Sequence, residues 1–237
     1  MNESITGEKL HEQDHIAISL CASFIADPLD DYLKYWSKEF ELDVKITFAP
    51  YNQVFQQLLD PKSLLNQNTG ISVLLIRVED WLRDQKESLP SEQTYFLNHT
   101  YLTFIEAIKQ SSKSSIAPFL VGIVPLSSSH SFPLQTATDI VEINSKLTAF
   151  LKDIPSFYSI DLTKIAALYE VEEMFDTKSD ELGHIPFTQE YYAALGTYLW
   201  RKIRAYKSPL YKVIALDCDN TLWKGICGED GTLRCSN

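Results

Sequence analysis

ISVLLIRV, residues 71–78, is a short segment that carries apolar residues on both of its faces. A strand with one side in water alternates between apolar and polar residues, because successive side chains point to opposite faces. A strand covered on both sides reads instead as a nearly continuous apolar run. The segment is therefore predicted to be an inner strand of a parallel sheet with helices on both faces.

Strand-like and helix-like segments alternate along the chain on both sides of this segment. Short apolar runs predict further strands at residues 15–23, 44–49, 119–126 and 157–162. Apolar residues at helical spacing predict helices at residues 29–40, 51–59, 94–110, 136–151 and 188–206. This order predicts an α/β fold, a three-layer parallel sheet between two layers of helices.

The chain is predicted to consist of three parts. Residues 1–14 are polar and are expected to form a loose tail, and residues 15–207 form the α/β domain. Lys207-Ser208-Pro209 interrupts the last helix, which places a domain boundary near residue 208. Residues 208–237 then form a linker and, at 212–216, the first strand of a second domain.

Bulk properties exclude several classes of protein. The formal net charge is -11, which argues against a nucleic-acid partner and against an anionic membrane surface. The apolar runs are strand-sized, and the N-terminus lacks the features of a secretory signal. The cysteines at 21, 218, 227 and 235 form no C-x-x-C pair, so neither a zinc site nor a disulfide framework is expected. A cytoplasmic location is predicted.

Two aspartates, Asp217 and Asp219, follow the apolar residues 213–216. Residues two apart on an extended segment face the same way, so both carboxylates can converge at the carboxyl end of a strand. Ligands of open α/β sheets bind at that end. Carboxylates beside phosphate oxygens need a hard cation, and Mg²⁺ suits this role. One carboxylate can then attack phosphorus, and the other can transfer a proton.

The residues Asp217, Asp219 and Thr221 resemble motif I, D-x-D-x-T, of the haloacid dehalogenase (HAD) superfamily. The resemblance implies that Asp217 is the nucleophile and a Mg²⁺ ligand. It implies that Asp219 is the general acid/base and binds Mg²⁺ through its backbone carbonyl. Residues 208–237 would then be the start of a HAD Rossmann-like domain.

A longer string, LDCDNTLWKGICGEDG at residues 216–231, resembles the FkbH-like proteins of HAD subfamily IIIC. SFIADPLDDYLKYW, APYNQVFQQLLDPKSLL, LLIRVEDWL and GHIPFTQEYYAALGTYLWRKIRA resemble the N-terminal domain of that family, so the likeness covers nearly all of residues 16–231. The family acts in polyketide and nonribosomal peptide pathways. The resemblance implies a phosphatase/transferase that takes a glyceryl unit from 1,3-bisphosphoglycerate, a small phosphorylated acyl donor, and loads it onto an acyl carrier protein.

A cysteine thioester is part of the scheme that this resemblance implies. Cys218 lies between the two aspartates and is the first candidate, with Cys227 and Cys235 behind it. Strand alternation also allows Cys218 to be a small buried residue that points away from the site. The other HAD motifs would lie beyond Asn237, so the chain as given is expected to lack a complete phosphatase site.

The N-terminal domain of this family is similar to SGNH (GDSL-type) hydrolases, in which a serine follows the first strand. Ser23 matches that nucleophile, His184 before the last helix matches the base, and Glu181 or Asp180 matches the acid that orients it. The Asn expected after the third strand is absent. The residues found there, Arg77-Val78-Glu79-Asp80, either line a cleft or form a solvated rim. Ser23 and His184 also fit purely structural roles.

Two alternatives to the phosphatase/transferase therefore stay open. One is a serine esterase that uses Ser23 and His184. The other is a non-catalytic domain that binds the carrier protein. For the second, Arg201, Lys202, Arg204 and Lys207 form a basic stretch on an acidic protein. They either dock an acidic partner or complement the dipole at the end of the last helix.

Overall fold

The computed structural model describes residues 16–85, 87–127 and 132–207. The predicted tail and the predicted start of the second domain lie outside these residues, and the boundary near residue 208 stays a prediction. No helix in the described ranges is both long and apolar enough to cross a membrane.

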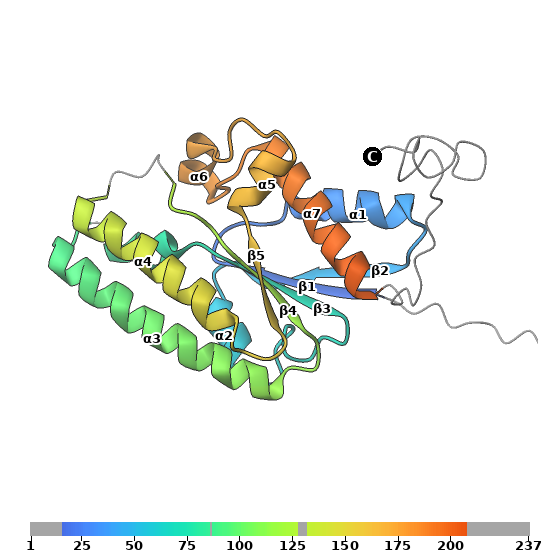
Figure 1. Cartoon of the computed structure of the whole chain (residues 1–237), viewed down its shortest axis with the longest axis horizontal. Helices are drawn as coiled ribbons and strands as arrows, with labels where there is room; N and C mark the ends of the chain where they lie inside the picture. The colour runs from blue at the N-terminus through green and yellow to red at the C-terminus, as the bar shows by residue number, and fades with distance from the viewer. Residues whose placement is uncertain (1–15, 86, 128–131, 208–237) are drawn as a thin grey trace, which may run out of the picture. The chain divides into compact units, whose positions relative to one another are not determined.

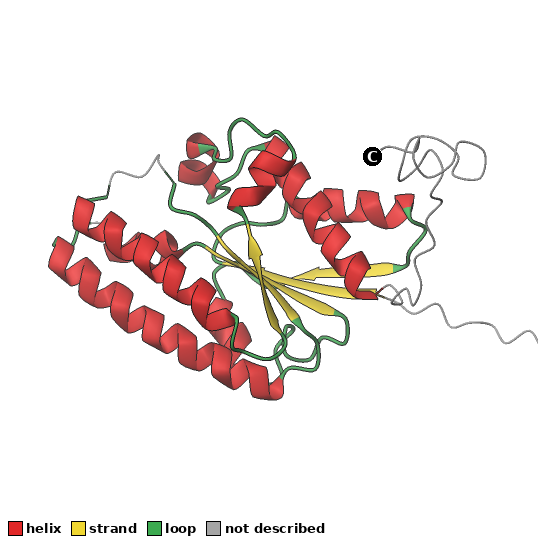
Figure 2. Cartoon of the chain, in the orientation of Figure 1, coloured by secondary structure: helices red, strands yellow, loops and turns green. Residues whose placement is uncertain are grey.

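The predicted parallel α/β sheet is confirmed (Figure 2). All neighbouring strands are parallel, in the order β2-β1-β3-β4-β5. The strands are β1 (Ile16–Ala22), β2 (Val44–Phe48), β3 (Ile71–Ile76), β4 (Phe119–Ile123) and β5 (Phe157–Asp161). β3 is the middle strand, and all six of its residues are buried, as predicted for a strand covered on both faces.

Helices cover both faces of the sheet (Figure 1). One side carries α1 (Leu29–Glu39) and α7 (Gln189–Lys207), and the other carries α2 (Val54–Leu59), α3 (Pro90–Ser114) and α4 (Leu134–Leu151). Alternate residues of β3 divide between the two apolar cores. Val73 and Leu75 pack on the α1 and α7 side, whereas Leu74 and Ile76 pack on the α3 and α4 side. This alternation explains why the strand needs apolar residues on both faces.

Three short elements escape prediction from periodicity. The third strand ends at Ile76, and the 3-10 helix η1 (Val78–Gln85) follows it. The helices α5 (Thr163–Leu168) and α6 (Thr177–Gly183) occupy the connection between β5 and α7. In α6 the local signal is the cap, because the Asp176 carboxylate accepts a hydrogen bond from the Ser179 N–H at 3.0 Å.

The strand order creates a crevice between the carboxyl ends of β1 and β3. The chain leaves β1 toward β2 on one side and leaves β3 toward β4 on the other. Such a reversal opens a gap above two adjacent strands, and ligands of α/β proteins bind there. Ser23 directly follows β1, and Arg77 directly follows β3. The fold therefore brings together two polar residues that are far apart in the sequence.

Gly196 tests how closely α1 and α7 pack. A methyl group at Gly196 would lie 2.7 Å from Cβ of Tyr32, an atom that cannot move without its helix. We expect Gly196→Ala to lower the free energy of unfolding by about 1–3 kcal/mol through overpacking, despite the better helix propensity of alanine. Urea denaturation measures the change.

Gly183→Ala is the matched control for this prediction. Its added methyl group would lie 3.6 Å from the nearest atom, an ordinary contact, so its stability should change little. An equal loss of stability in both variants would contradict the tight helix contact.

Candidate functional site

Ser23 lies at the bottom of the crevice and is only 2% exposed. Its backbone N–H donates to the carbonyl of Leu75 at 3.1 Å, which continues the pairing of β1 with β3. Its Oγ donates to Oδ2 of Asp80 at 2.7 Å and accepts the backbone N–H of Arg77 at 3.0 Å. The hydroxyl therefore has both a donor and an acceptor contact inside the domain.

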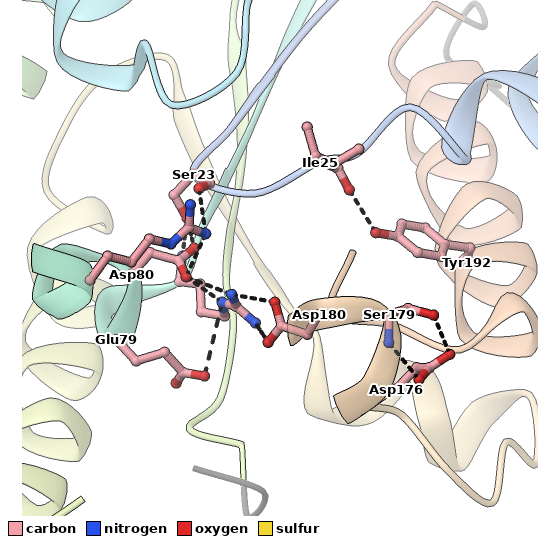
Figure 3. Close-up of polar contacts among 10 residues, drawn as sticks. Ser23, Ile25, Glu79, Asp80, Asp176, Ser179, Asp180 and Tyr192 are labelled. Atoms are coloured by element: carbon pink, nitrogen blue, oxygen red, sulfur yellow. Dashed lines mark hydrogen bonds and ion pairs between the residues drawn. The ribbon is translucent and has the colours of Figure 1, made fainter. Parts of the chain in front are cut away.

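Arg77 is the centre of a buried ion network, and its partners Asp80 and Asp180 are labelled in Figure 3. Its Nε donates to Oδ1 of Asp80 at 2.7 Å. Its Nη1 and Nη2 donate to the two carboxylate oxygens of Asp180, at 2.5 and 2.8 Å. Arg83 completes the network, since its Nη2 lies 2.9 Å from Oδ1 of Asp80 and donates to the Ser23 carbonyl at 3.2 Å. The network thus joins β1, β3, η1 and α6.

Glu79 is a third carboxyl group beside the two guanidinium groups of the network. Its Oε1 lies 3.9 Å from Nε of Arg77. Burial raises the pKa of Glu79 to about 8, so this carboxyl carries its proton at neutral pH. Burial also raises the pKa of Asp80, to about 6, although Arg77 opposes the shift. At pH 7 two guanidinium groups therefore face two carboxylates, and the charges balance.

His184 lies at the exposed mouth of the crevice. It follows α6 in a left-handed conformation, with φ of 54°, and its carbonyl accepts the N–H of Ile25 at 2.9 Å. The imidazole stacks on Tyr51, with ring centroids 5.5 Å apart and planes at 8°. Arg83 covers the same tyrosine ring at 5.2 Å from its centroid. These contacts hold His184 in place through aromatic and backbone interactions.

The structure brings the predicted esterase residues to one edge of the sheet. Asp180, Glu181 and His184 line a cavity of about 70 Å³ together with Arg77 and other residues. Within the described ranges, however, the hydroxyl of Ser23 bonds to Asp80 and to the Arg77 backbone, and both oxygens of Asp180 bind Arg77. The catalytic roles of Ser23 and His184 stay predictions.

Sequence reasoning places Arg77, Glu79 and Asp80 at a strand end, either in a cleft or on a rim. The structure buries all three. It also adds Arg83 and Tyr51, which no motif identifies. The sequence did give one indication of a polar site, because charged residues directly follow a fully apolar strand. The sequence marked Ser23 as a candidate nucleophile but not as the partner of Asp80, because that hydrogen bond depends on the register of β1 against β3.

The predicted phosphatase residues lie outside the described part of the chain. They are the ligands Asp217 and Asp219 with the cysteines Cys218, Cys227 and Cys235. Their roles, including Mg²⁺ binding, stay predictions. Among the described residues, no group of three or more His, Cys, Asp or Glu side chains is arranged to hold a metal ion.

Solved structures with a similar fold include a phosphatase-containing protein and a lipase. The N-terminal part of protein BF1531 from Bacteroides fragilis, which contains a phosphatase domain complexed with Mg, has a TM-score of 0.66 and 18% identity. The match covers 93% of this chain and 60% of that structure. The lipase Lip_vut3 from goat rumen metagenome has a TM-score of 0.51 and 13% identity, with 79% of this chain and 96% of the lipase covered.

The third structure is the salicylyl-acyltransferase SsfX3 from a tetracycline biosynthetic pathway. Its TM-score of 0.44 and identity of 14%, over 81% of this chain and 55% of that chain, are too low to support an argument. No protein-family model matches the sequence, and the search of curated proteins gave no significant match. At these identities the first two matches show the fold alone, which is that of a lipase and of part of a phosphatase-containing protein.

Arg77→Gln tests the network. The substitution leaves the carboxylates of Asp80 and Asp180 buried without their main cation. We expect the free energy of unfolding to fall by about 3–5 kcal/mol, the cost of an uncompensated buried charge. Chemical denaturation at pH 7 measures it. Lys146→Gln removes an exposed ion pair with Glu142 and should cost less than about 1 kcal/mol. Similar costs for both variants would contradict a buried network.

Glu79→Gln tests the protonation state of Glu79. Because the folded protein holds this proton up to a pKa of about 8, it binds more protons than the unfolded chain between about pH 4.5 and 8. Stability should therefore fall as pH rises through this window. Glutamine cannot ionise, so the variant should match the parent near pH 5 and exceed it by about 2–4 kcal/mol at pH 8.5. Parallel pH profiles of unfolding would show that Glu79 is ionised throughout.

Proposed function

We propose that this chain forms the N-terminal part of a Mg²⁺-dependent HAD-type phosphatase/transferase. In this proposal the protein transfers a glyceryl unit from 1,3-bisphosphoglycerate to an acyl carrier protein, and the α/β domain binds rather than reacts. The observation that supports assigning the chemistry to residues outside the α/β domain is the buried hydroxyl of Ser23, which donates to Asp80.

A serine nucleophile needs a base that takes its proton and a path to the ester carbonyl. Ser23 is 2% exposed, and its proton is directed at Asp80. The oxygens of Asp80 are also engaged by Arg77 and Arg83, so this carboxylate already serves the buried ion network. The backbone N–H of Arg77 also donates to Oγ of Ser23, which fixes the hydroxyl on the side of the network. These contacts favour a structural role for Ser23.

The phosphoryl chemistry is therefore assigned to Asp217 and Asp219. Their carboxylate and carbonyl oxygens are the donors that Mg²⁺ prefers, and the ion would neutralise the charge of the phosphate. Asp217 attacks phosphorus of the phosphate ester and forms an aspartyl-phosphate, Asp219 protonates the departing alcohol oxygen, and water activated by Asp219 then releases phosphate. The acyl group moves separately: a thiol, with Cys218 as the first candidate, attacks the carbonyl carbon of the acyl phosphate, phosphate leaves, and the thioester passes the glyceryl unit to the thiol of the carrier protein. The similarity in fold to a phosphatase-containing protein supports the arrangement of an α/β domain before such a motif. The chain spans 60% of that structure, so the activity is proposed for the whole protein.

The basic end of α7 supports a carrier-protein partner. Arg201, Lys202 and Arg204 are exposed on a chain whose net charge is -11. Nη1 of Arg201 lies 3.4 Å from the hydroxyl of Tyr169, and Lys202 covers the ring of Tyr198 at 5.2 Å. These contacts orient cations at the surface, where they favour an acidic partner.

Mass spectrometry of the carrier protein tests the assignment. With 1,3-bisphosphoglycerate and Mg²⁺, Asp217→Asn should reduce loading by about 10³-fold or more, because the nucleophile is removed. Ser23→Ala should leave loading within about threefold of the parent. Double charge reversal at Arg201 and Arg204 should weaken loading and leave phosphate release unchanged, because only docking depends on it.

An ester substrate provides the opposing outcome. Hydrolysis of a short-chain nitrophenyl ester by the parent that disappears in Ser23→Ala would assign the activity to the α/β domain. Full loading activity in Asp217→Asn would contradict the phosphatase assignment directly.

A further inference from the structure

Charge rather than apolar contact holds α6 against the domain. Asp180 is the buried residue of this helix, and Leu182 is 81% exposed. The segment around α6 is closed at its base by a bridge between Phe175 and Phe187 and by the hydrogen bond from the Asp176 N–H to the Pro186 carbonyl at 2.9 Å. Beyond this base, α6 is a short helix whose Asp180 carboxylate, labelled in Figure 3, binds Arg77.

Asp180 binds Arg77 in the geometry of a bound ligand. Both terminal nitrogens of the guanidinium donate, one to each carboxylate oxygen, at 2.5 and 2.8 Å. Arginine recognises planar carboxylates and phosphates through this two-point contact. Asp80 binds the other edge of the guanidinium group, through Nε and Nη2. The pair of terminal nitrogens, Nη1 and Nη2, is called the fork of Arg77 below, and Asp80 keeps it oriented when Asp180 is absent.

The surroundings of the fork suit an anion once Asp180 withdraws. Arg77 and Arg83 carry two positive charges, Asp80 carries one negative charge, and Glu79, with its pKa raised to about 8 by burial, is neutral at pH 7. These four groups together carry a charge of +1, and the exposed carboxylate of Glu181 also lines the cavity. The cavity of about 70 Å³ borders both Arg77 and Asp180, so space is already present beside the fork.

We propose that the guanidinium fork of Arg77 is a binding site for a small oxyanion, a carboxylate or a phosphate, which Asp180 occupies as a tethered competitor. When α6 moves away, the ligand takes the two hydrogen bonds of Asp180. His184, at the end of α6, has φ of 54°, a strained conformation for a residue with a side chain, and its contacts with Tyr51 and Ile25 anchor the end of the segment about which α6 moves. Binding of the anion thus releases α6 from the domain.

Chemical rescue of Asp180→Ala tests the proposal in the full chain. The variant should unfold at a lower temperature than the parent, because Arg77 loses its bidentate partner. Formate or inorganic phosphate at 50 mM should raise its Tm by about 2–4 °C above a sodium chloride control of equal ionic strength. The parent should show no such rise, because Asp180 already fills the fork. Formate alone would identify a carboxylate site, and phosphate alone would identify a phosphate site.

Asp176→Ala is the matched control, because it loosens the same helix and leaves the competitor in place. Its carboxylate caps α6 through Ser179 and does not touch Arg77 in the described structure. Its amide hydrogens in residues 178–184 should exchange faster than those of the parent, without any response to formate or phosphate.

Hydrogen exchange also provides a reading that does not depend on Tm. In Asp180→Ala, amides 178–184 should exchange at least about tenfold faster, while those of β3 stay protected and an anion leaves α6 released. If that variant does not fold, Asp180→Asn keeps the shape of the side chain and allows the same measurement. The proposal is wrong if neither anion raises the Tm of the Asp180 variants, or if the Asp176 control responds equally.

Discussion

The contact between the Arg77 guanidinium and the carboxylates of Asp80 and Asp180 holds together the carboxyl edge of the sheet. Arg77 ends the middle strand, and its partners belong to η1 and α6. Ser23 joins the same group from the end of β1. Each residue alone would be costly to bury, because a charge or hydroxyl loses its water. Together they satisfy one another, and the crevice between β1 and β3 is closed by polar contacts.

The topology explains why a polar network lies at this position. The strand connections diverge above β1 and β3, so no helix fills the gap with apolar side chains. Strand ends there also point backbone groups toward the gap, and the Arg77 N–H finds its acceptor in Ser23. The raised pKa of Glu79 follows from the same geometry, because burial in the closed crevice removes water from this carboxyl group and Arg77 only partly offsets that cost. Structure and protonation state are thus set by one arrangement.

The crevice that holds a ligand in many α/β proteins here holds the protein's own side chains. Ser23, the predicted serine nucleophile, and Asp180, one of the two predicted acids, are both bound to neighbours within the network. This places the reactive chemistry, in our proposal, with the aspartates after residue 208. It also leaves the arginine fork as a site that a ligand can enter only by displacing Asp180.

The sequence by itself determined the alternation of strands and helices, the central place of β3 and the Asp217-Cys218-Asp219 motif, because each is encoded in neighbouring residues. It also placed charged residues at the end of β3. Only the tertiary structure decided their partners. Asp80 meets Ser23 across 57 positions, and Asp180 meets Arg77 across 103. The first pair depends on the register of β1 against β3, and the second depends on where the chain places the short helix α6. Neighbouring residues in the sequence specify neither of these.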